Sequence, residues 1–458
     1  MKRYALDDLR IWKEAPNRKP LILRGARQVG KTELVRIFAR ECFESFIEIN
    51  FDEHPSKSTF FEEEDIRIVC KYIEIDAGIK LVPGKTLLFL DEIQSVPQVL
   101  ARLRYFYERM PELHVICAGS LLDFTLADHE IAMPVGRMEF MFLGPMTFGE
   151  FLHAREQVSI EEYLAGYHIG QDIPLALHKK ILGLLREYLL IGGMPGVVKR
   201  YIESGLDFES AAREQQGILQ TFYADFGKYK RRINVPFIQD LFRKVPLNIG
   251  KTIKFSSLNP DVRSVVVREG LEHLEKARII YRVFHADANG IPLGAELNHN
   301  YFKLLFLDVG LVSSLLGLRL TDLRPDTDYT LVHSGLIAEQ FVGQHVLYSP
   351  KRWMEPALYY WNRPIRGSSS EVDYLIQCGT RVVPVEVKAG KTGRLKSLQM
   401  FVLEKRPPLA LRFNSDAPSV IHTTTSVAGR DPQGFSLLSL PLYLAEQTQR
   451  LLDEYFEG

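Results

Sequence analysis

Residues 21–32 read Leu-Ile-Leu-Arg-Gly-Ala-Arg-Gln-Val-Gly-Lys-Thr, and a helix-like stretch follows at residues 33–43. An apolar run leads into a loop with Gly25 near its start and Gly30 near its end, which is the pattern of a phosphate-binding loop between a strand and a helix. Glycine lets the backbone turn successive N–H groups inward, and the N-terminus of the following helix adds a positive field. The stretch therefore predicts a site for a nucleoside triphosphate such as ATP.

The end of this loop has two residues with separate expected roles. Lys31 is expected to bridge the β- and γ-phosphates as a point charge, and Thr32 to place its hydroxyl on Mg²⁺. The plain alternative is a glycine-rich turn that binds nothing. Two other Gly-Lys-Thr tripeptides, at residues 250–252 and 390–392, lack a glycine at the start of the loop. The predicted phosphate-binding residues are Gly25, Ala26, Arg27, Gln28, Val29, Gly30, Lys31 and Thr32.

A second apolar run ends in two adjacent carboxylates. Residues 86–94 read Thr-Leu-Leu-Phe-Leu-Asp-Glu-Ile-Gln, which is typical of a buried parallel strand. We expect Asp91 to hold Mg²⁺ through water and Glu92 to polarise the attacking water. A helix N-cap is the alternative, but the apolar residues that lead directly into the pair favour the catalytic interpretation.

Composition limits the classes of protein that the chain can be. With 458 residues it is long enough for about three domains, and 46% hydrophobic with 25% charged residues is ordinary for a globular protein. The 57 basic and 57 acidic residues balance, so a site for nucleic acid would have to be local. Four scattered cysteines, the absence of a signal peptide and the lack of a long apolar run predict a cytoplasmic protein without membrane association.

From residue 21 to about residue 152, short apolar runs alternate with amphipathic stretches, which predicts an α/β fold with a parallel sheet. The expected strands are residues 21–24, 46–50, 87–90, 114–118 and 138–143. Together with Ser120 after the fourth strand and Arg137 before the fifth, the pattern resembles the ATPase core of the AAA superfamily. The resemblance implies that Ser120 senses the γ-phosphate and that Arg137 reaches into a neighbouring subunit of a homo-oligomer. Taken alone, these two residues would be a cap and a surface charge.

The next part of the chain, up to about residue 232, is expected to be a helical lid. Residues 192–195, Gly-Gly-Met-Pro, resemble an element that some relatives of this ATPase class place against the nucleotide base, with a helix-breaking turn as the alternative. The run Lys-Tyr-Lys-Arg-Arg at residues 228–232 is either a contact for nucleic acid or a solvated face. Helical stretches at 237–248 and 260–277, followed by apolar runs at 279–284 and 302–307, predict a winged helix.

The last third of the sequence contains a second chemical pattern. Residues 383–388 read Val-Pro-Val-Glu-Val-Lys, and alternation places Glu386 and Lys388 on one face of a strand. Asp373 lies in an earlier run with the same alternation, so two neighbouring strands would present the three side chains to one point. Carboxylates that hold Mg²⁺ beside a lysine are what hydrolysis of a phosphodiester needs, and Glu339 on the preceding helical stretch would complete the metal site.

These residues resemble the PD-(D/E)xK restriction-endonuclease-like fold, although no proline precedes Asp373. An exposed edge strand is the plain alternative for the Glu-x-Lys pair. Local basic residues support the resemblance, namely Arg363, Arg366, Lys391, Arg394 and Lys396. Nearly the whole chain resembles AAA-type ATPases that carry a C-terminal domain of unknown function, of the DUF4143 type, containing such a nuclease-like module. The resemblance implies ATP binding and work on DNA.

The sequence therefore predicts an ATPase core at 1–152, a helical lid at 153–232, a winged-helix-like domain at 233–325 and a nuclease-like domain at 326–458. The expected function is binding and hydrolysis of ATP with Mg²⁺, coupled to DNA binding and to Mg²⁺-dependent DNA cleavage. Two alternatives remain open: a regulatory ATPase whose nuclease-like domain is an inactive binding platform, and a nuclease gated by ATP binding alone. The predicted catalytic residues are Lys31, Glu92, Asp373, Glu386 and Lys388. The predicted metal ligands are Thr32, Asp91, Glu339, Asp373 and Glu386.

Overall fold

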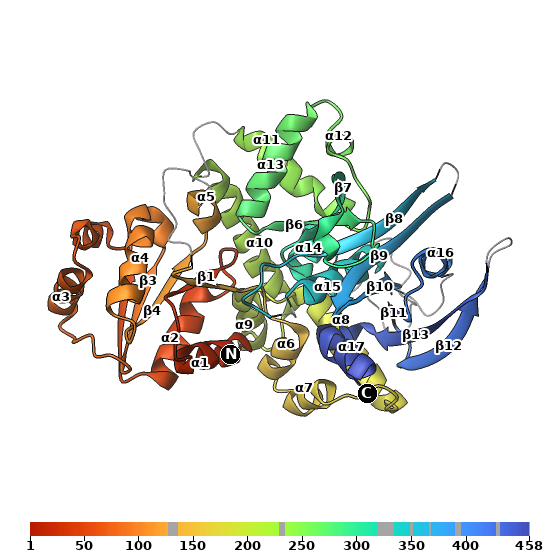
Figure 1. The fold of residues 1–458 in the computed structure, drawn as a ribbon, viewed down its shortest axis with the longest axis horizontal. Coiled ribbons are helices and arrows are strands. Elements are labelled where there is room, and N and C mark those ends of the chain that lie inside the picture. Colours follow the sequence, from red (N-terminus) through yellow and green to blue (C-terminus); the bar gives the residue numbers. More distant parts are fainter. Residues whose placement is uncertain are drawn as a thin grey trace. The chain divides into compact units, whose positions relative to one another are not determined.

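The computed structural model describes residues 1–126, 136–228, 234–318, 334–348, 351–365, 368–389, 395–426 and 431–457. The chain folds into two compact units (Figure 1). Unit 1 comprises Met1–Pro145, Lys276–Arg278 and Lys351–Pro356, and unit 2 comprises Met146–Glu275, Ile279–Pro350 and Ala357–Gly458. Two short segments from the second half of the chain thus belong to the N-terminal unit. The finer division into four domains stays a prediction.

Unit 1 is built on a parallel sheet of five strands in the order β2-β3-β4-β1-β5, which confirms the predicted α/β fold of this part. The strands are β1 (Leu21–Arg24), β2 (Ser45–Asn50), β3 (Thr86–Asp91), β4 (His114–Gly119) and β5 (Glu139–Phe142). Both β3 and β4 are buried along their whole length, as expected of apolar runs covered on both faces. Because β4 lies between β1 and β3, the residue after β4 lies between the loops that follow those two strands.

The helices of unit 1 are α1 (Ala5–Glu14), α2 (Lys31–Cys42), α3 (Ile66–Ala77), α4 (Pro97–Arg109) and α5 (Leu122–Leu126). Apolar residues of α3 and α4 share one core with the strands, including Val69 of α3, Leu103 of α4 and Leu88 of β3. Trp12 of α1 packs against Phe38 of α2, with ring centroids 6.5 Å apart. The sheet is therefore covered by helices that its own sequence segments supply.

The first part of unit 2 is helical, as predicted, with α6 (Phe148–Ala154), α7 (Val158–Ala165), α8 (Leu175–Ile191), α9 (Pro195–Glu203) and α10 (Phe208–Asp225). The glycines between α8 and α9 are explained by close approach to other backbone and side-chain atoms. A Cβ at Gly192 would lie 2.1 Å from Oδ1 of Asp308, and one at Gly193 would lie 1.9 Å from the carbonyl oxygen of Met146. Residues 192–195 therefore form a helix-breaking turn, and a contact with a nucleotide base stays a prediction.

The remainder of unit 2 contains an eight-stranded mixed sheet in the order β12-β13-β11-β10-β9-β8-β6-β7. Its strands are β6 (Ile280–Ala286), β7 (Leu297–Phe306), β8 (Tyr359–Ile365), β9 (Ser368–Cys378), β10 (Arg381–Val387), β11 (Leu409–Asn414), β12 (Ser419–Thr425) and β13 (Gln433–Pro441). The helices are α11 (Val235–Lys244), α12 (Phe255–Leu258), α13 (Ser264–Lys276), α14 (Val309–Leu315), α15 (Ser334–Tyr348), α16 (Lys396–Lys405) and α17 (Thr448–Glu457). Short 3-10 helices are η1 (Pro55–Glu62), η2 (Ile93–Ser95), η3 (Phe226–Lys228), η4 (Pro246–Asn248), η5 (Leu293–Ala295) and η7 (Leu442–Gln447).

The two apolar runs predicted as strands of a wing are β6 and β7, which pair antiparallel. In addition, β6 pairs with β8, so these strands belong to the same sheet as the C-terminal strands. A continuous sheet therefore crosses the predicted boundary at residue 325. This pairing places β7 within the sheet that carries the nuclease-like pattern.

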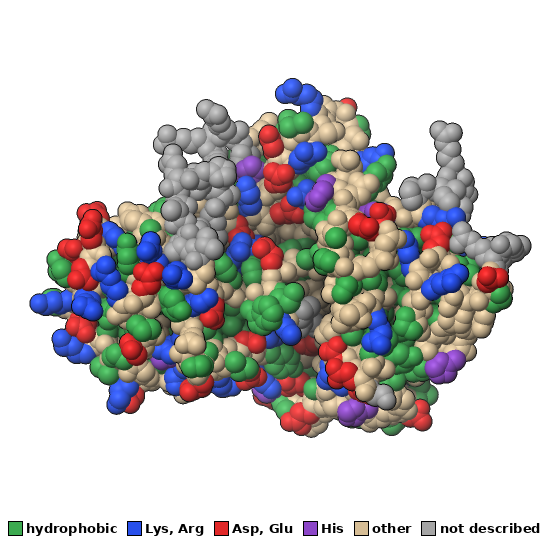
Figure 2. All heavy atoms as spheres, in the orientation of Figure 1, with side chains coloured by type: hydrophobic (Ala, Val, Ile, Leu, Met, Phe, Trp, Pro, Cys, Tyr) green, Lys and Arg blue, Asp and Glu red, His purple; other side chains and the backbone are tan. Residues whose placement is uncertain are grey.

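Surface features bear on the predicted partners. On the face drawn in Figure 2, basic and acidic side chains are interspersed, as expected of a balanced composition. In the described part of the chain, no single helix is long and apolar enough to cross a membrane, and α8 with α9 passes that test only as a pair bent by 117°. Residues 229–232 of the predicted basic run at 228–232 lie outside the described residues, as do the predicted basic residues Arg366, Lys391 and Arg394.

Candidate nucleotide site and acidic cluster

The loop between β1 and α2 has the backbone that a phosphate-binding loop requires. A Cβ at Gly25 would lie 2.3 Å from the carbonyl oxygen of Leu143, so only glycine fits there. Gly30 caps α2 with φ of +91°, and Gln28 also has a positive φ, +65°. These left-handed residues turn the chain sharply enough for N–H groups of the loop to face one point. The predicted strand, loop and helix are confirmed.

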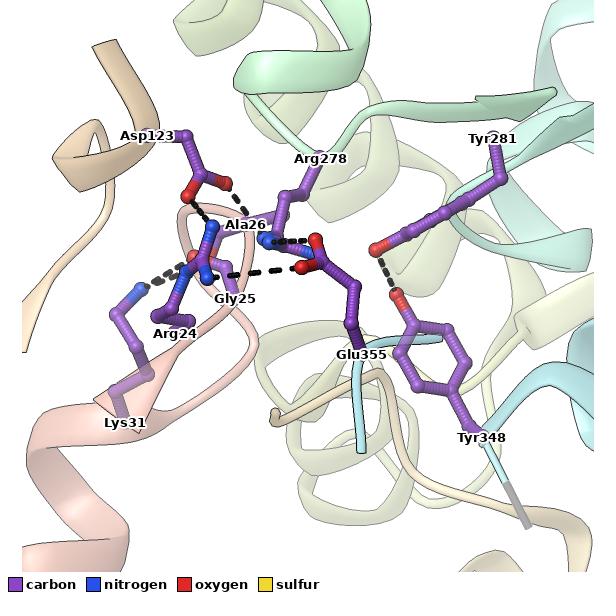
Figure 3. Close-up of polar contacts among 9 residues, drawn as sticks. All are labelled: Arg24, Gly25, Ala26, Lys31, Asp123, Arg278, Tyr281, Tyr348 and Glu355. Carbon is purple, nitrogen blue, oxygen red and sulfur yellow. Dashed lines mark hydrogen bonds and ion pairs between the residues drawn. The ribbon is translucent and has the colours of Figure 1, made fainter. Parts of the chain in front are cut away.

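Lys31 is buried, with 7% of its surface exposed. Its Nζ donates hydrogen bonds to the carbonyl oxygens of Gly25 and Ala26, both at 2.9 Å (Figure 3). Burial lowers the pKa of Lys31 to about 8. Since a phosphate would favour the charged form of this ammonium, binding of a nucleotide and protonation of Lys31 support each other.

Thr32 and Asp91 provide a suitable pair of oxygens for Mg²⁺. Thr32 Oγ1 donates a hydrogen bond of 2.8 Å to Asp91 Oδ2. In an octahedral shell with Mg–O distances of about 2.0 to 2.1 Å, neighbouring oxygens lie about 2.9 Å apart, so this pair fits two adjacent ligand positions. Asp91 is 2% exposed, and burial raises its pKa to about 6. The bound metal would compensate for that cost.

Glu92 lies at the start of a chain of polar contacts. Gln94 Nε2 donates a hydrogen bond of 2.5 Å to Glu92 Oε2, and Ser120 Oγ lies 3.5 Å from the same oxygen. Arg27 Nε donates to Ser120 Oγ at 3.1 Å. Ser120 thus joins the phosphate loop to the predicted base, as the position of β4 between β1 and β3 requires. The role of Gln94 was not predicted, and its only signal was a polar side chain two residues after Glu92.

Arg137 lies against α4 of its own chain. Its Nε donates a hydrogen bond of 2.9 Å to Glu108 Oε1, and its side chain is 46% exposed. Its guanidinium also lies over the ring of Tyr107, 5.8 Å from the centroid. The structure therefore places Arg137 on the surface of unit 1, and its action in a neighbouring subunit stays a prediction.

Four further charged residues of unit 1 form what we term the arginine cluster: Arg24, Asp123, Arg278 and Glu355 (Figure 3). Arg278 Nε lies 2.7 Å from Asp123 Oδ2, and its Nη2 donates to Glu355 Oε1 at 3.0 Å. Arg24, the residue before Gly25, also forms an ion pair with Asp123. Sequence reasoning missed these residues, because local spacing contains no signal for contacts between segments so far apart.

A second cluster lies in unit 2, where the nuclease-like site was predicted. Lys303 of β7 is 1% exposed, and its Nζ lies 2.8 Å from Glu339 Oε1, 2.7 Å from Glu371 Oε1 and 3.3 Å from Asp373 Oδ1. Burial alone would lower the pKa of Lys303, but the surrounding carboxylates hold it well above its ordinary value. Burial raises the pKa of Glu339 to about 7, while Lys303 opposes that rise. The ammonium group of Lys303 thus provides, next to these carboxylates, the positive charge that the predicted Mg²⁺ ion would provide.

The predicted pairing of two neighbouring strands in this cluster is confirmed. Asp373 lies on β9 and Glu386 on β10, and these strands pair antiparallel. Lys388 Nζ lies 2.5 Å from Glu386 Oε1, and the Val387 N–H donates to Asp373 Oδ2 at 2.8 Å. Within the described ranges, no group of three or more His, Cys, Asp or Glu residues could hold a metal ion. The structure thus brings Glu339 and Asp373 together at Lys303, a residue that the sequence pattern did not indicate, whereas Glu386 pairs with Lys388 on the neighbouring segment.

The fold and the site of unit 1 define an AAA-type nucleotide-binding domain. Residues 17–152 match the model of a family described as "AAA domain". Residues 182–322 and 334–443 match two models described as domains of unknown function, DUF8612 and DUF4143. The chain therefore combines an AAA-type domain with a C-terminal DUF4143 domain, as predicted. No curated protein matches the chain.

Several solved structures are similar to parts of the chain. They include PCH-2 of C. elegans (16% identity, TM-score 0.22, covering 38% of this chain and 49% of that one). ORC1 of Aeropyrum pernix in complex with DNA gives 11% identity and a TM-score of 0.27, covering 68% of this chain and 90% of that one. The RuvB Holliday junction branch migration motor of Thermotoga maritima gives 14% and 0.28, covering 65% and 93%. At such TM-scores, these likenesses support no conclusion about function.

Proposed function

We propose that unit 1 binds MgATP and hydrolyses it, and that the C-terminal domain is a binding platform controlled by the nucleotide rather than a nuclease. The observation that carries the first part is the convergence of three loops on one place. The phosphate loop brings Lys31, the end of β3 brings Asp91 and Glu92, and the end of β4 brings Ser120. This is the set of groups that phosphoryl transfer to water requires.

Each group has a defined task in this proposal. Lys31 and the N–H groups of the loop stabilise the charge of the β- and γ-phosphates. Thr32 and Asp91 would hold Mg²⁺, which neutralises the charge that develops on those oxygens when it is bound. Glu92 accepts a proton from the attacking water, and Gln94 fixes the carboxylate that does so.

The proposal of a platform without cleavage rests on Lys303. A nuclease of the predicted kind needs an open cation position among Glu339, Asp373 and Glu386, whereas Lys303 already contacts Glu339 and Asp373. Displacing this buried ammonium would leave it without its three partners, which is costly. We propose DNA as the partner of the platform, because the family resemblance implies it.

Metal-dependent cleavage is the second candidate, favoured by the Glu386–Lys388 pair and by the hydrogen bond that the Val387 N–H, between these two residues, donates to Asp373. Incubation of plasmid and linear DNA with the protein and Mg²⁺ or Mn²⁺ separates the two candidates. The platform predicts that wild type and Lys388→Ala both leave the DNA intact, while a gel-shift assay detects DNA binding that depends on ATP. Cleavage by wild type that Lys388→Ala abolishes would overturn the platform.

The ATPase activity is tested by phosphate release from MgATP. Wild type should hydrolyse ATP with multiple turnovers. Lys31→Ala should lose ATP binding, whereas Glu92→Gln should bind ATP without hydrolysing it. Asp373→Ala is the matched control because it removes a carboxylate from unit 2, and its rate of hydrolysis should equal that of wild type. Equal rates for wild type and Glu92→Gln would contradict the proposed base.

A further inference from the structure

We propose that Arg278 is a ligand of the ATP γ-phosphate supplied by the second half of the same chain, and that Asp123 and Glu355 hold it until ATP arrives. This inference rests on the proposed ATP site. The inference adds to that site a residue that distinguishes ATP from ADP. It also adds a covalent connection by which the bound nucleotide can affect unit 2. Four observations support it.

The first observation is the placement of Arg278. Segment Lys276–Arg278 belongs to unit 1, although the residues on both sides of it belong to unit 2. The side chain of Arg278 is 7% exposed, and its guanidinium packs over the ring of Phe142, 4.8 Å from the centroid. Phe142 ends β5, which pairs directly with β1, the strand that leads into the phosphate loop. Arg278 is therefore held against the strands that present the loop.

The second observation is the charge around the loop. Arg24 and Arg278 share Asp123, which follows Ser120 closely along the chain, and Arg24 is bonded to Gly25 of the loop. Arg278 is thus joined through one shared carboxylate to the residue that immediately precedes the phosphate loop. A guanidinium can exchange a carboxylate for a phosphate because both accept its paired N–H groups.

The third observation is that the contact with Glu355 is easily exchanged. Glu355 is 63% exposed at its side chain, so water can solvate the carboxylate when Arg278 leaves it. Its second contact, from Arg24 Nη1 to Oε2, is long at 3.9 Å. Because Arg278 is buried and only Glu355 is exposed, the carboxylate can return to water when the contact breaks, and a triphosphate brings more negative charge to the guanidinium than a carboxylate does. ATP can therefore compete with Glu355 for this guanidinium, whereas ADP lacks the phosphate that would do so.

The fourth observation is the course of the chain. Arg278 lies between α13 and β6, and Glu355 lies between α15 and β8, so each segment continues into unit 2 at both ends. Within unit 2, Tyr281 and Tyr348, which are close to these segments along the chain, join through their hydroxyl groups (Figure 3). Arg352 ties the segment of Glu355 to unit 1, because its Nη1 lies 2.6 Å from Asp8 Oδ2. A change at Arg278 or Glu355 is thus carried covalently to the unit that holds the platform.

The test is calorimetric titration of the full chain with MgATP and, separately, with MgADP. For Arg278→Ala we expect ATP affinity to fall roughly 10- to 100-fold, as for the loss of a charge-assisted hydrogen bond, with ADP affinity unchanged within about twofold. Glu355→Gln removes the competing carboxylate, so ATP affinity should rise severalfold and ADP affinity should stay constant. The matched control is Arg282→Ala, four residues away in unit 2, where Arg282 pairs with Glu275 at 2.5 Å. It should change neither affinity.

Each outcome decides between the possibilities. If wild type binds neither nucleotide, the proposed function fails. If wild type binds ATP and Arg278→Ala behaves like Arg282→Ala, this inference fails and the arginine cluster is structural only. Equal losses for ATP and ADP also overturn it, since they indicate general damage to the site. Should Arg278→Ala not fold, as judged by circular dichroism, Glu355→Gln still decides the question, because its ATP affinity should rise while its ADP affinity stays constant, and an unchanged ATP affinity would overturn the inference.

Discussion

Replacement of Lys303 by methionine should destabilise unit 2 more than any other single change in the acidic cluster. The ammonium lies 2.7 Å, 2.8 Å and 3.3 Å from carboxylates of Glu371, Glu339 and Asp373, and it is 1% exposed. Methionine fills much of the same space but leaves these acids facing one another. Removing one partner of a buried ion pair costs about 3–5 kcal/mol. We expect the free energy of unfolding of unit 2 to fall by that amount at neutral pH.

The same variant should become responsive to Mg²⁺. Without Lys303, the carboxylates of Glu339 and Asp373 lack a positive partner, so we expect them to bind a divalent cation. A metal present at ten times its Kd would stabilise the folded state by about 1.4 kcal/mol. Wild type should show no such response, because the ammonium already supplies the charge. Urea denaturation of the full chain, with Mg²⁺ or with a chelator, measures both effects. Lys388→Met is the control, since its side chain is 32% exposed and its loss should be much smaller.

Two results would refute this reasoning. A Lys303→Met protein within about 1 kcal/mol of wild type would mean that the ammonium is not what holds the carboxylates together. Stabilisation of wild type by Mg²⁺ equal to that of the variant would mean that a metal binds beside Lys303. In that case cleavage, rather than a platform without cleavage, would become the favoured function of the C-terminal domain.

Three further predictions concern unit 1. MgATP affinity should be highest between pH 6 and pH 8, because protonation of Asp91 (pKa about 6) opposes metal binding below this window and deprotonation of Lys31 (pKa about 8) weakens phosphate binding above it. Titration calorimetry across this range checks the prediction, and Lys31→Arg should lose the decline at high pH. Gln94→Ala should lower kcat roughly 10- to 100-fold through misplacement of Glu92, with ATP affinity unchanged, as steady-state and binding assays would show. Gly25→Ala should abolish ATP binding and lower the melting temperature, since its Cβ would lie 2.3 Å from a carbonyl oxygen. A melting temperature equal to that of wild type would contradict this.

The nucleotide site could be predicted in large part because its residues follow one another along the chain. The spacing from Gly25 to Thr32 and the apolar run before Asp91 are local signals, and the parallel sheet brings the ends of β1, β3 and β4 to one edge. The five strands of unit 1 were predicted for the same reason, since each is a short apolar run between amphipathic stretches.

Two features of the sites could not be predicted from the local spacing of residues, and both are contacts between segments that are distant in the sequence. Arg278 and Glu355 join unit 1 from the second half of the chain, and no periodicity marks them. Lys303 is one of many lysines, and it enters the acidic cluster because β7 joins the sheet that contains β9. Alternation showed that β6 and β7 are strands, but it could not show that β6 pairs with β8.

The central claim is that the loop at residues 25–32 binds a triphosphate together with Mg²⁺. Titration calorimetry of the folded full chain with ATP, in the presence and in the absence of Mg²⁺, tests it most directly. We predict saturable binding that Mg²⁺ strengthens, that Lys31→Ala abolishes and that Glu92→Gln retains. No heat of binding with wild type, or equal binding by Lys31→Ala, would contradict the claim.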